Sequence, residues 1–414
     1  MSKKLIKNGT VINGTGADAK EGHIVVVEGN KIVYVGPEES YDVCGDEEVI
    51  DAQGGTILPG LIDTHVHMMF EYEPVQKRLT TPFSMMFYKA QKYFEKTINA
   101  GVTSVRDALG ADLGVKHAVE QGYIKGPRLQ VSINALTITG GHGDGTQLSG
   151  QVLDILPSDY PGMPDGRCDG VDEVRKKTRQ MLRAGAEVIK VHATGGVLSP
   201  TDHPEFTQFS LDELKAIVEE GKFRKGVKVM AHAQGAEGIK NAVKAGIHSI
   251  EHGIFIDDEV AELMVESGTY LVPTLLAPVS VLEMADQLGM PQSAVEKSKE
   301  VIEQHKESIA RAHKAGVKIA MGTDAGVFLH GTNLRELGLM VDVGITPMEA
   351  LVASTKTAAE CLGWDDKLGT LEEGKLADVV VVKGNPLNDI YSLADNDHVQ
   401  VVIKDGKIEK NLLV

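Results

Sequence analysis

Hydrophobic and polar positions alternate in short runs at both ends of the chain. KLIKNGTVING, GHIVVVEGNKIVYVG and EVIDAQGGTILPG fill the first 57 residues, and glycine-containing turn signals separate them. The same pattern returns after residue 365, in KLGTLEEGKLADVVVV and VQVVIKDGKIEK. Alternation with a period of two is typical of half-buried strands. We therefore predict a small β-sandwich domain built from residues 1–57 and 365–414.

Between these ends, short apolar runs alternate with longer segments of helical periodicity, a pattern that predicts parallel βα units. Eight runs qualify as strands: LPGLIDTHVH, VTSVRD, RLQVSI, EVIKVHA, VKVMAHA, HSIEHG, YLVPTLLA and VKIAMGTDAG. Capping boxes predict two of the helix starts, from Ser210 to Glu213 and from Thr346 to Glu349. The predicted fold class is α/β, with a closed (β/α)8 TIM barrel over residues 58–364.

The net charge of the chain limits the classes of molecule that we expect it to bind. The 414 residues carry a formal net charge of -17, which disfavours binding to nucleic acid or to an anionic membrane and favours a small-molecule substrate. The three cysteines, Cys44, Cys168 and Cys361, form no CxxC motif, which favours a reducing compartment. The first residues have the pattern of a strand and a turn, and no apolar run approaches the roughly 20 residues of a membrane span. We expect a cytoplasmic protein.

Ligand-type side chains gather at the C-terminal ends of the predicted strands. They are His65 and His67 on the first strand, Lys190 on the fourth, His232 on the fifth, His252 on the sixth and Asp324 on the eighth. His65 and His67 face the same way, because alternate residues of a strand share a face. The C-terminal strand ends of a (β/α)8 barrel form the floor of its active site, so we expect the six side chains to converge there.

The residue types at these positions indicate a metal centre. Neutral imidazoles and a carboxylate suit zinc, and a catalytic zinc ion uses about three protein ligands, so four histidines and an aspartate predict two divalent ions. Lys190 ends an apolar run, where burial lowers the pKa of its ammonium group. A neutral amine there can take up carbon dioxide and become N6-carboxylysine, an anionic ligand able to bridge two metal ions.

The strand-end motifs, taken together, resemble those of the amidohydrolase superfamily. GLIDTHVH, GVTSVRD, TGGHGDG, EVIKVHATGG, AHAQG, SIEHG and MGTDAG are similar to the imidazolonepropionase-related group, which includes Xaa-Pro dipeptidases. The resemblance covers essentially the whole chain. It implies that His65, His67 and Asp324 hold one metal ion, that His232 and His252 hold the other, and that carboxylated Lys190 bridges them. It also implies a homo-oligomer.

The resemblance extends to residues that would meet the substrate. His142, in TGGHGDG, matches a histidine that contacts the scissile carbonyl in these dipeptidases. Gln234 stands where prolidase-like members have a tyrosine that looks like a carboxylate-binding residue, so the chain departs from the Xaa-Pro pattern there. Arg106 could meet a substrate carboxylate or form a structural ion pair with Asp107 or another barrel carboxylate. His330 follows on a loop expected to rim the site.

These residues lead us to expect hydrolysis of an amide or peptide bond by a metal-bridging hydroxide. Asp324 would accept the proton of that hydroxide and pass it to the leaving nitrogen, and His142 would stabilise the oxyanion. A dipeptidase that releases proline or a related C-terminal residue is the expected function. N-acyl amino acids, other small amides and cyclic amides are the alternative substrates.

Three other functions compete with this hypothesis. Lys190 could act as a Schiff-base nucleophile of the aldolase type, which leaves the four histidines unexplained. Deamination of a cyclic amidine by one metal ion would not need Lys190. A metal-free binding or assembly protein on the same barrel would be expected to have lost ligands, and this chain retains all six.

Overall fold

The computed structural model describes residues 3–43, 45, 47–147, 149–154, 156, 160–199 and 202–413. Cys44 lies outside the described residues, and Cys168 and Cys361 are free and buried. Among the helices of the described residues, none is long and apolar enough to cross a membrane.

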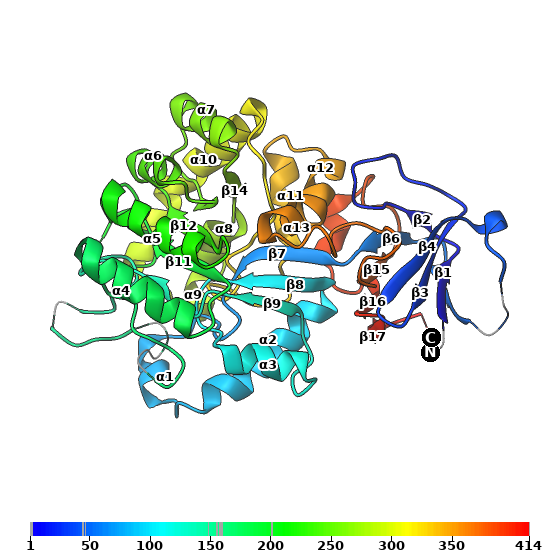
Figure 1. The fold of residues 1–414 in the computed structure, drawn as a ribbon, viewed down its shortest axis with the longest axis horizontal. Coiled ribbons are helices and arrows are strands. Elements are labelled where there is room, and N and C mark those ends of the chain that lie inside the picture. Colours follow the sequence, from blue (N-terminus) through cyan, green and yellow to red (C-terminus); the bar gives the residue numbers. More distant parts are fainter. Residues whose placement is uncertain are drawn as a thin grey trace.

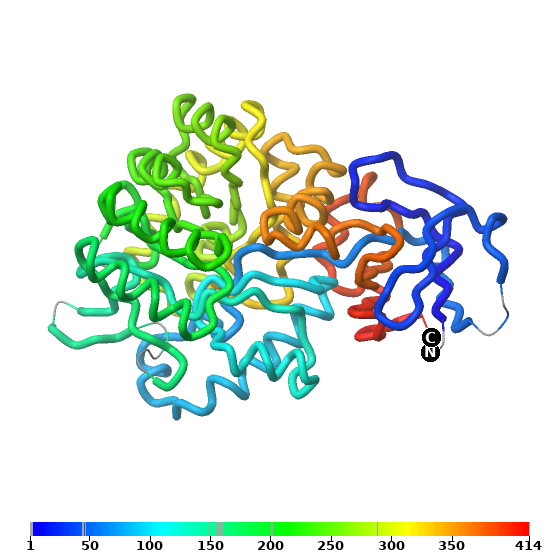
Figure 2. The backbone as a smooth tube through the Cα atoms, viewed as in Figure 1, coloured from blue at the N-terminus to red at the C-terminus, as the bar shows by residue number. Residues whose placement is uncertain are grey.

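Strands from both ends of the chain form two sheets. The first has the order β4 (Lys31–Pro37), β3 (His23–Glu28), β1 (Lys3–Lys7) and β5 (Glu48–Asp51). The second has the order β17 (Lys407–Asn411), β16 (Val399–Lys404), β15 (Val379–Val382), β6 (Thr56–Pro59) and β2 (Thr10–Val11). Antiparallel pairing of β6 with β15 joins the two ends of the chain, which lie together in blue and red in Figures 1 and 2. Alternate residues such as Ile6, Val25, Ile57 and Val379 bury their side chains in one hydrophobic cluster that both sheets share.

The middle of the chain contains two parallel sheets. One has the order β7 (Leu61–Val66), β8 (Val102–Asp107) and β9 (Arg128–Val131). The other has the order β10 (Ala135–Leu136), β11 (Val188–His192), β12 (Lys228–Ala233), β13 (Ser249–His252) and β14 (Tyr270–Val272). The ladder is interrupted between β9 and β10, where Ile133 has a left-handed backbone with φ of 69°. These sheets do not form one continuous hydrogen-bonded ring.

The last two predicted strands are shorter than expected. β14 ends at Val272, because the chain turns at Thr274, which has φ of 49°, and helix α8 (Leu276–Glu283) follows. The eighth predicted strand is reduced to two single parallel bridges, Leu271 with Ile319 and Val66 with Ala325. These bridges still connect the segment after residue 316 to β14 on one side and to β7 on the other.

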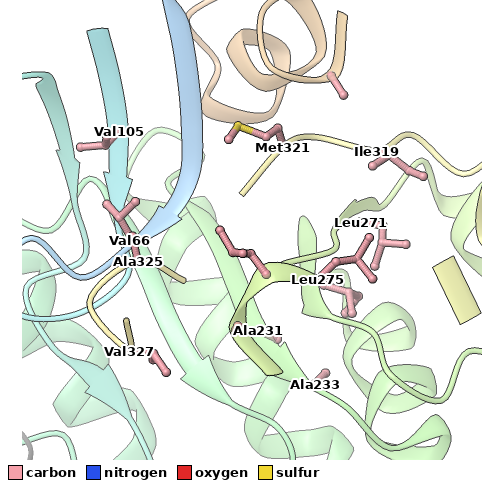
Figure 3. Close-up of a cluster of buried hydrophobic side chains, with 14 of the residues drawn as sticks. Val66, Val105, Ala231, Ala233, Leu271, Leu275, Ile319, Met321, Ala325 and Val327 are labelled. Carbon is pink, nitrogen blue, oxygen red and sulfur yellow. The ribbon is translucent and has the colours of Figure 1, made fainter. Parts of the chain in front are cut away.

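Helices surround the parallel strands, as Figure 1 shows. They are α1 (Val75–Thr80), α2 (Met85–Asn99), α3 (Leu113–Glu120), α4 (Gly170–Arg183), α5 (Leu211–Phe223), α6 (Ala236–Ala245), α7 (Asp258–Ser267), α8, α9 (Ala285–Leu288), α10 (Gln292–Ala315), α11 (Arg335–Asp342), α12 (Pro347–Ala353) and α13 (Lys356–Leu362). Both predicted capping boxes are confirmed, at Ser210 with Glu213 and at Thr346 with Glu349. Apolar residues of strands and helices make the main core, part of which appears in Figure 3 around Val66, Ala231 and Leu271.

Candidate active site

The six side chains predicted at the strand ends come together in one cluster. The Nζ atom of Lys190 lies 3.4 Å from Nε2 of His65, and Nε2 of His67 lies 3.0 Å from Oδ1 of Asp324. The ring of His252 is 5.1 Å from that of His65 and 4.6 Å from that of His232, centroid to centroid. The four histidines and Lys190 are buried. The two parallel sheets therefore place side chains from four different strands in one buried cluster.

Outer hydrogen bonds fix the orientation of three of these imidazole rings. Nδ1 of His67 donates to the Leu109 carbonyl at 3.2 Å, and Nε2 of His232 donates to the Gly195 carbonyl at 2.9 Å. Nδ1 of His65 lies 2.7 Å from Oε2 of Glu251 and donates to this carboxylate. Each ring, when neutral, then carries only a lone pair on its other nitrogen. Such outer partners are the usual means by which proteins orient histidine ligands of metals.

This arrangement fits a divalent cation. The remaining lone pairs of His67 and His65 lie 3.0 and 3.4 Å from Oδ1 of Asp324. Two lone pairs facing each other at this distance repel unless a cation or a proton lies between them. One ligand atom from each of His65, His67 and Asp324 can be chosen so that all three lie within 4.8 Å of one another. Two imidazoles and a carboxylate are a donor set that zinc accepts.

Burial sets the charges of the cluster. It lowers the pKa values of His232 and His252 well below the ordinary 6.5 and keeps both rings neutral, the form that binds a metal. Burial acts to raise the pKa of Asp324, but where a proton lies between this carboxylate and His65 or His67, the hydrogen bonds and the positive charge of these rings outweigh burial and hold that pKa well below its usual range. Burial also lowers the pKa of Lys190 to about 8, although the charges of Glu251 and Asp324 oppose this.

The backbone at two of the six residues is left-handed, with φ of 72° at His252 and 66° at Asp324. Such conformations cost roughly 1–3 kcal/mol each and persist only where neighbouring groups hold them. Helix α10 supplies those groups at His252. Nε2 of His305 donates to the His252 carbonyl at 2.8 Å, and Oγ of Ser308 donates to the Gly253 carbonyl at 2.5 Å. The sequence contains no local signal for this support.

Arg106 is a structural residue and does not offer its guanidinium to a substrate. The guanidinium donates to the Thr64 carbonyl at 2.6 Å, to Oγ of Ser249 at 3.1 Å and to Oε1 of Glu251 at 2.9 Å. Only 1% of the side chain is exposed, so a substrate carboxylate cannot reach it. Of the two roles considered for Arg106, the structure has the ion pair, with Glu251 as the partner rather than Asp107.

Glu251 was missed in the sequence, although an acidic residue inside the apolar strand SIEHG was an available signal. Its carboxylate joins Arg106 to His65. Burial acts to raise the pKa of Glu251, but the Arg106 charge and the His65 hydrogen bond outweigh it and lower that pKa to about 2. Glu251 is therefore ionised at neutral pH and holds His65 in place.

The predicted substrate-contact residues differ in their surroundings. The ring of His142 stacks on that of His232, with centroids 4.3 Å apart. Gln234 is buried at the end of β12, and its side-chain Oε1 has no hydrogen-bond partner among the described residues. The ring of His330 is not exposed at the rim of the site. The side chain is buried because its ring stacks on Tyr93 and its Nε2 donates to the Phe70 carbonyl at 2.9 Å.

Comparisons with known proteins show the family of the chain. Residues 56–408 match the amidohydrolase family. The chain is 36% identical to an ochratoxinase of Aspergillus niger, over 98% of this chain and 86% of that protein. It is similar to the crystal structure of a Xaa-Pro dipeptidase with bound methionine in the active site, with a TM-score of 0.88 and 38% identity over 98% of this chain and 99% of that one. The crystal structure of a prolidase complexed with N-methylphosphonate-L-proline is also similar, with a TM-score of 0.91 and 35% identity over 99% of this chain and 100% of that one.

These relatives confirm the resemblance to prolidase-like amidohydrolases and imply a fold of the TIM-barrel type. Members of the superfamily are generally metal-dependent and act on small molecules. The chain belongs to the amidohydrolase family and is a hydrolase that acts on C–N bonds.

Proposed function

We propose that the protein is a binuclear metal-dependent dipeptidase that cleaves before proline or a related C-terminal residue. The observation that carries this proposal is the cluster of four buried histidines with Lys190 and Asp324, which offers more ligands than one catalytic ion uses. The similarity to a Xaa-Pro dipeptidase and to a prolidase supports the substrate class.

In this proposal, His65, His67 and Asp324 would hold one ion, and His232 and His252 would hold the other. Lys190, as N6-carboxylysine, would serve as a shared ligand. The lowered pKa of Lys190 and its position next to His65 support this role, because carboxylation needs a neutral amine. Two divalent ions, zinc by the type of ligand, would polarise the scissile carbonyl and lower the pKa of a water molecule.

The chain's own residues would move the proton and stabilise the charge. Asp324 is ionised and can accept a proton from the attacking water and deliver it to the leaving nitrogen. His142 lies against His232 at the edge of the cluster and can donate to the carbonyl oxygen as negative charge develops there.

Gln234 favours a second substrate class. Gln234 replaces the tyrosine that looks like a carboxylate-binding residue in prolidase-like members, and its unpartnered Oε1 can accept a hydrogen bond from a substrate N–H, which a substrate carboxylate cannot donate. This supports N-acyl amino acids, other small amides or cyclic amides as alternative substrates. The similarity to an ochratoxinase is in keeping with such a substrate.

We further propose that residues 58–364 form the catalytic domain with its barrel closed through the segment after residue 316. Residues 1–57 and 365–414 would form the β-sandwich domain. The two bridges at Ile319 and Ala325 support the closure of the barrel, and the shared cluster of the terminal sheets supports the sandwich, with β6 crossing the boundary between the two domains. A homo-oligomer in the cytoplasm belongs to the same proposal.

The test is hydrolysis of a matrix of dipeptides varied at both ends, together with N-acyl amino acids, by purified zinc-loaded protein. Metal analysis should find two ions per chain. Turnover of Xaa-Pro or of another C-terminal class would support the dipeptidase. Two bound ions without turnover of any dipeptide would overturn it in favour of a non-peptide amide.

A further inference from the structure

A buried hydroxyl and a buried carboxylate lie behind the ring of His142, on the segment that follows β11. Nδ1 of His142 lies 2.8 Å from Oγ of Ser199, and this hydroxyl donates to Oδ1 of Asp202. The other carboxylate oxygen of Asp202 lies 3.5 Å from the same Nδ1. Ser199 and Asp202 are 9% and 7% exposed, so water does not compete strongly for these contacts.

The direction of the hydrogen bonds follows from counting hydrogens. Ser199 has a single hydroxyl hydrogen, which it donates to Asp202. Its oxygen must therefore accept from Nδ1–H of His142. This arrangement leaves Nε2 of His142 for another partner, and the described residues supply none.

Gln208 binds both the backbone of His142 and the carboxylate of Asp202. Its Oε1 accepts from the backbone N–H of His142 at 3.1 Å, and its Nε2 donates to Oδ2 of Asp202 at 3.2 Å. One buried carboxamide thus fixes the carboxylate relative to the backbone that carries the ring. The ring of His142 and its hydrogen-bond partners are held as one unit.

Lys297 of α10 anchors the segment that carries Ser199 and Asp202. Its ammonium donates to the carbonyl groups of Gly196, Ser199 and Asp202, at 3.1, 2.7 and 2.7 Å. Gly196 allows the segment to pass close to the imidazole, since a Cβ atom there would lie 2.2 Å from Cε1 of His142. The contacts of Lys297 are with backbone carbonyl groups, so they do not depend on the Ser199 hydroxyl.

We propose that Ser199 and Asp202 are positioning residues, which hold the His142 ring so that Nε2 meets the carbonyl oxygen of the substrate. This inference rests on the proposed function, because His142 needs a substrate carbonyl to act on. Neither residue touches the substrate. Their contribution passes through Nδ1 of His142.

The test compares S199A, S199T and D202N in the metal-loaded enzyme, with a dipeptide that the wild type hydrolyses. Outer partners that orient metal-binding histidines typically contribute about 10- to 100-fold to metal affinity or activity, and we take the same range for the partners of His142. We expect kcat to fall by about that factor in S199A and D202N, KM to change by less than about threefold, and S199T to restore most of the rate because it keeps a hydroxyl. The matched control is D169N, which removes an exposed carboxylate that accepts from Thr139 on the neighbouring loop and should leave kcat unchanged.

A double-mutant cycle separates positioning from a general structural role. If Ser199 acts through His142, S199A should cost nothing further in the H142A background, whereas a structural effect would cost the same in both backgrounds. Wild-type kcat in S199A, or additive losses in the double mutant, would overturn the inference.

Crystal structures of metal-loaded wild type and S199A give a readout that does not depend on activity. We expect the His142 ring to be rotated or spread over two orientations in S199A, and an unchanged ring would also overturn the inference. A wild type that hydrolyses no dipeptide or N-acyl amino acid would overturn the proposed function instead, and the ring orientation would still decide the role of Ser199.

Discussion

Replacing Arg106 with methionine tests whether this residue supports the fold or binds substrate. Methionine has a similar length and no charge, so the change removes the three hydrogen bonds to Thr64, Ser249 and Glu251 and leaves the Glu251 carboxylate buried without its cation. Removing one partner of a buried ion pair typically costs about 3–5 kcal/mol of unfolding free energy. The folded protein should therefore be clearly less stable.

The size of the effect can be converted to a melting temperature. With about 2.1 cal/mol/K of unfolding entropy per residue, the 414-residue chain has roughly 0.9 kcal/mol/K in total. A loss of about 3–5 kcal/mol then lowers the melting temperature by about 3–6 °C. Circular dichroism during heating measures this shift. Because Glu251 also orients His65, we expect R106M to bind less metal as well.

The control is R128M. Arg128 pairs with Asp378 and Asp405 away from the candidate site, so R128M should lose stability but keep its metal content and KM. The double variant R106M/E251Q should recover part of the stability lost in R106M, because no unpaired buried charge remains. An R106M enzyme with the wild-type melting temperature and metal content but a tenfold higher KM would refute the structural role and assign Arg106 to the substrate.

Other predictions follow from the same geometry. D324N should abolish turnover while leaving the far-UV circular dichroism spectrum unchanged, because a carboxamide cannot accept the proton; near-normal activity would refute the proposed role. K190A should bind fewer than two ions per chain by metal analysis, whereas K215A, an exposed control, should bind as many as the wild type. Burial raises the pKa of Glu336 to about 8, against the lowering effect of the N–H groups of Leu276 and Leu275. A folded pKa above the ordinary 4.5 confers stability that is fully present below about pH 4.5 and lost, by up to about 5 kcal/mol, as the pH rises through 8. Urea unfolding at pH 5 and pH 9 should show this loss of unfolding free energy. E336Q, which cannot ionise, should show a smaller loss, and equal losses in both proteins would contradict the assignment.

Local patterns in the sequence were enough to predict most of the secondary structure and the six clustered side chains. Strand periodicity places His65 and His67 on one face, and the pairing of parallel strands puts His232 beside His192 and His252 beside Ala233. Because parallel strands end at the same edge, residues far apart in sequence meet there without any further information. The capping box at Ser210 is equally local, since its partners are three residues apart.

The sequence alone did not determine the contacts that orient these side chains, because each of them joins remote segments. Arg106 pairs with Glu251, 145 residues further along the chain. Arg106 therefore holds the carboxylate that orients His65 and does not contact a substrate. His142 meets Ser199 across 57 residues. The choice between a buried ion pair and a free guanidinium depends on which groups packing excludes from water. A hydrophobic pattern with a period of 2 or 3.6 residues does not identify those groups.

The sequence therefore determines which types of metal ligand the site contains, whereas the tertiary structure determines the pKa values and charges of these groups. The imidazole, carboxylate and amine groups are fixed by the residues themselves. Their pKa values are set by burial, as for Lys190 at about 8, and by neighbours brought in from other strands, as for Glu251 at about 2. The physical reason is that desolvation and Coulomb interaction depend on distances in space, which only the folded chain defines.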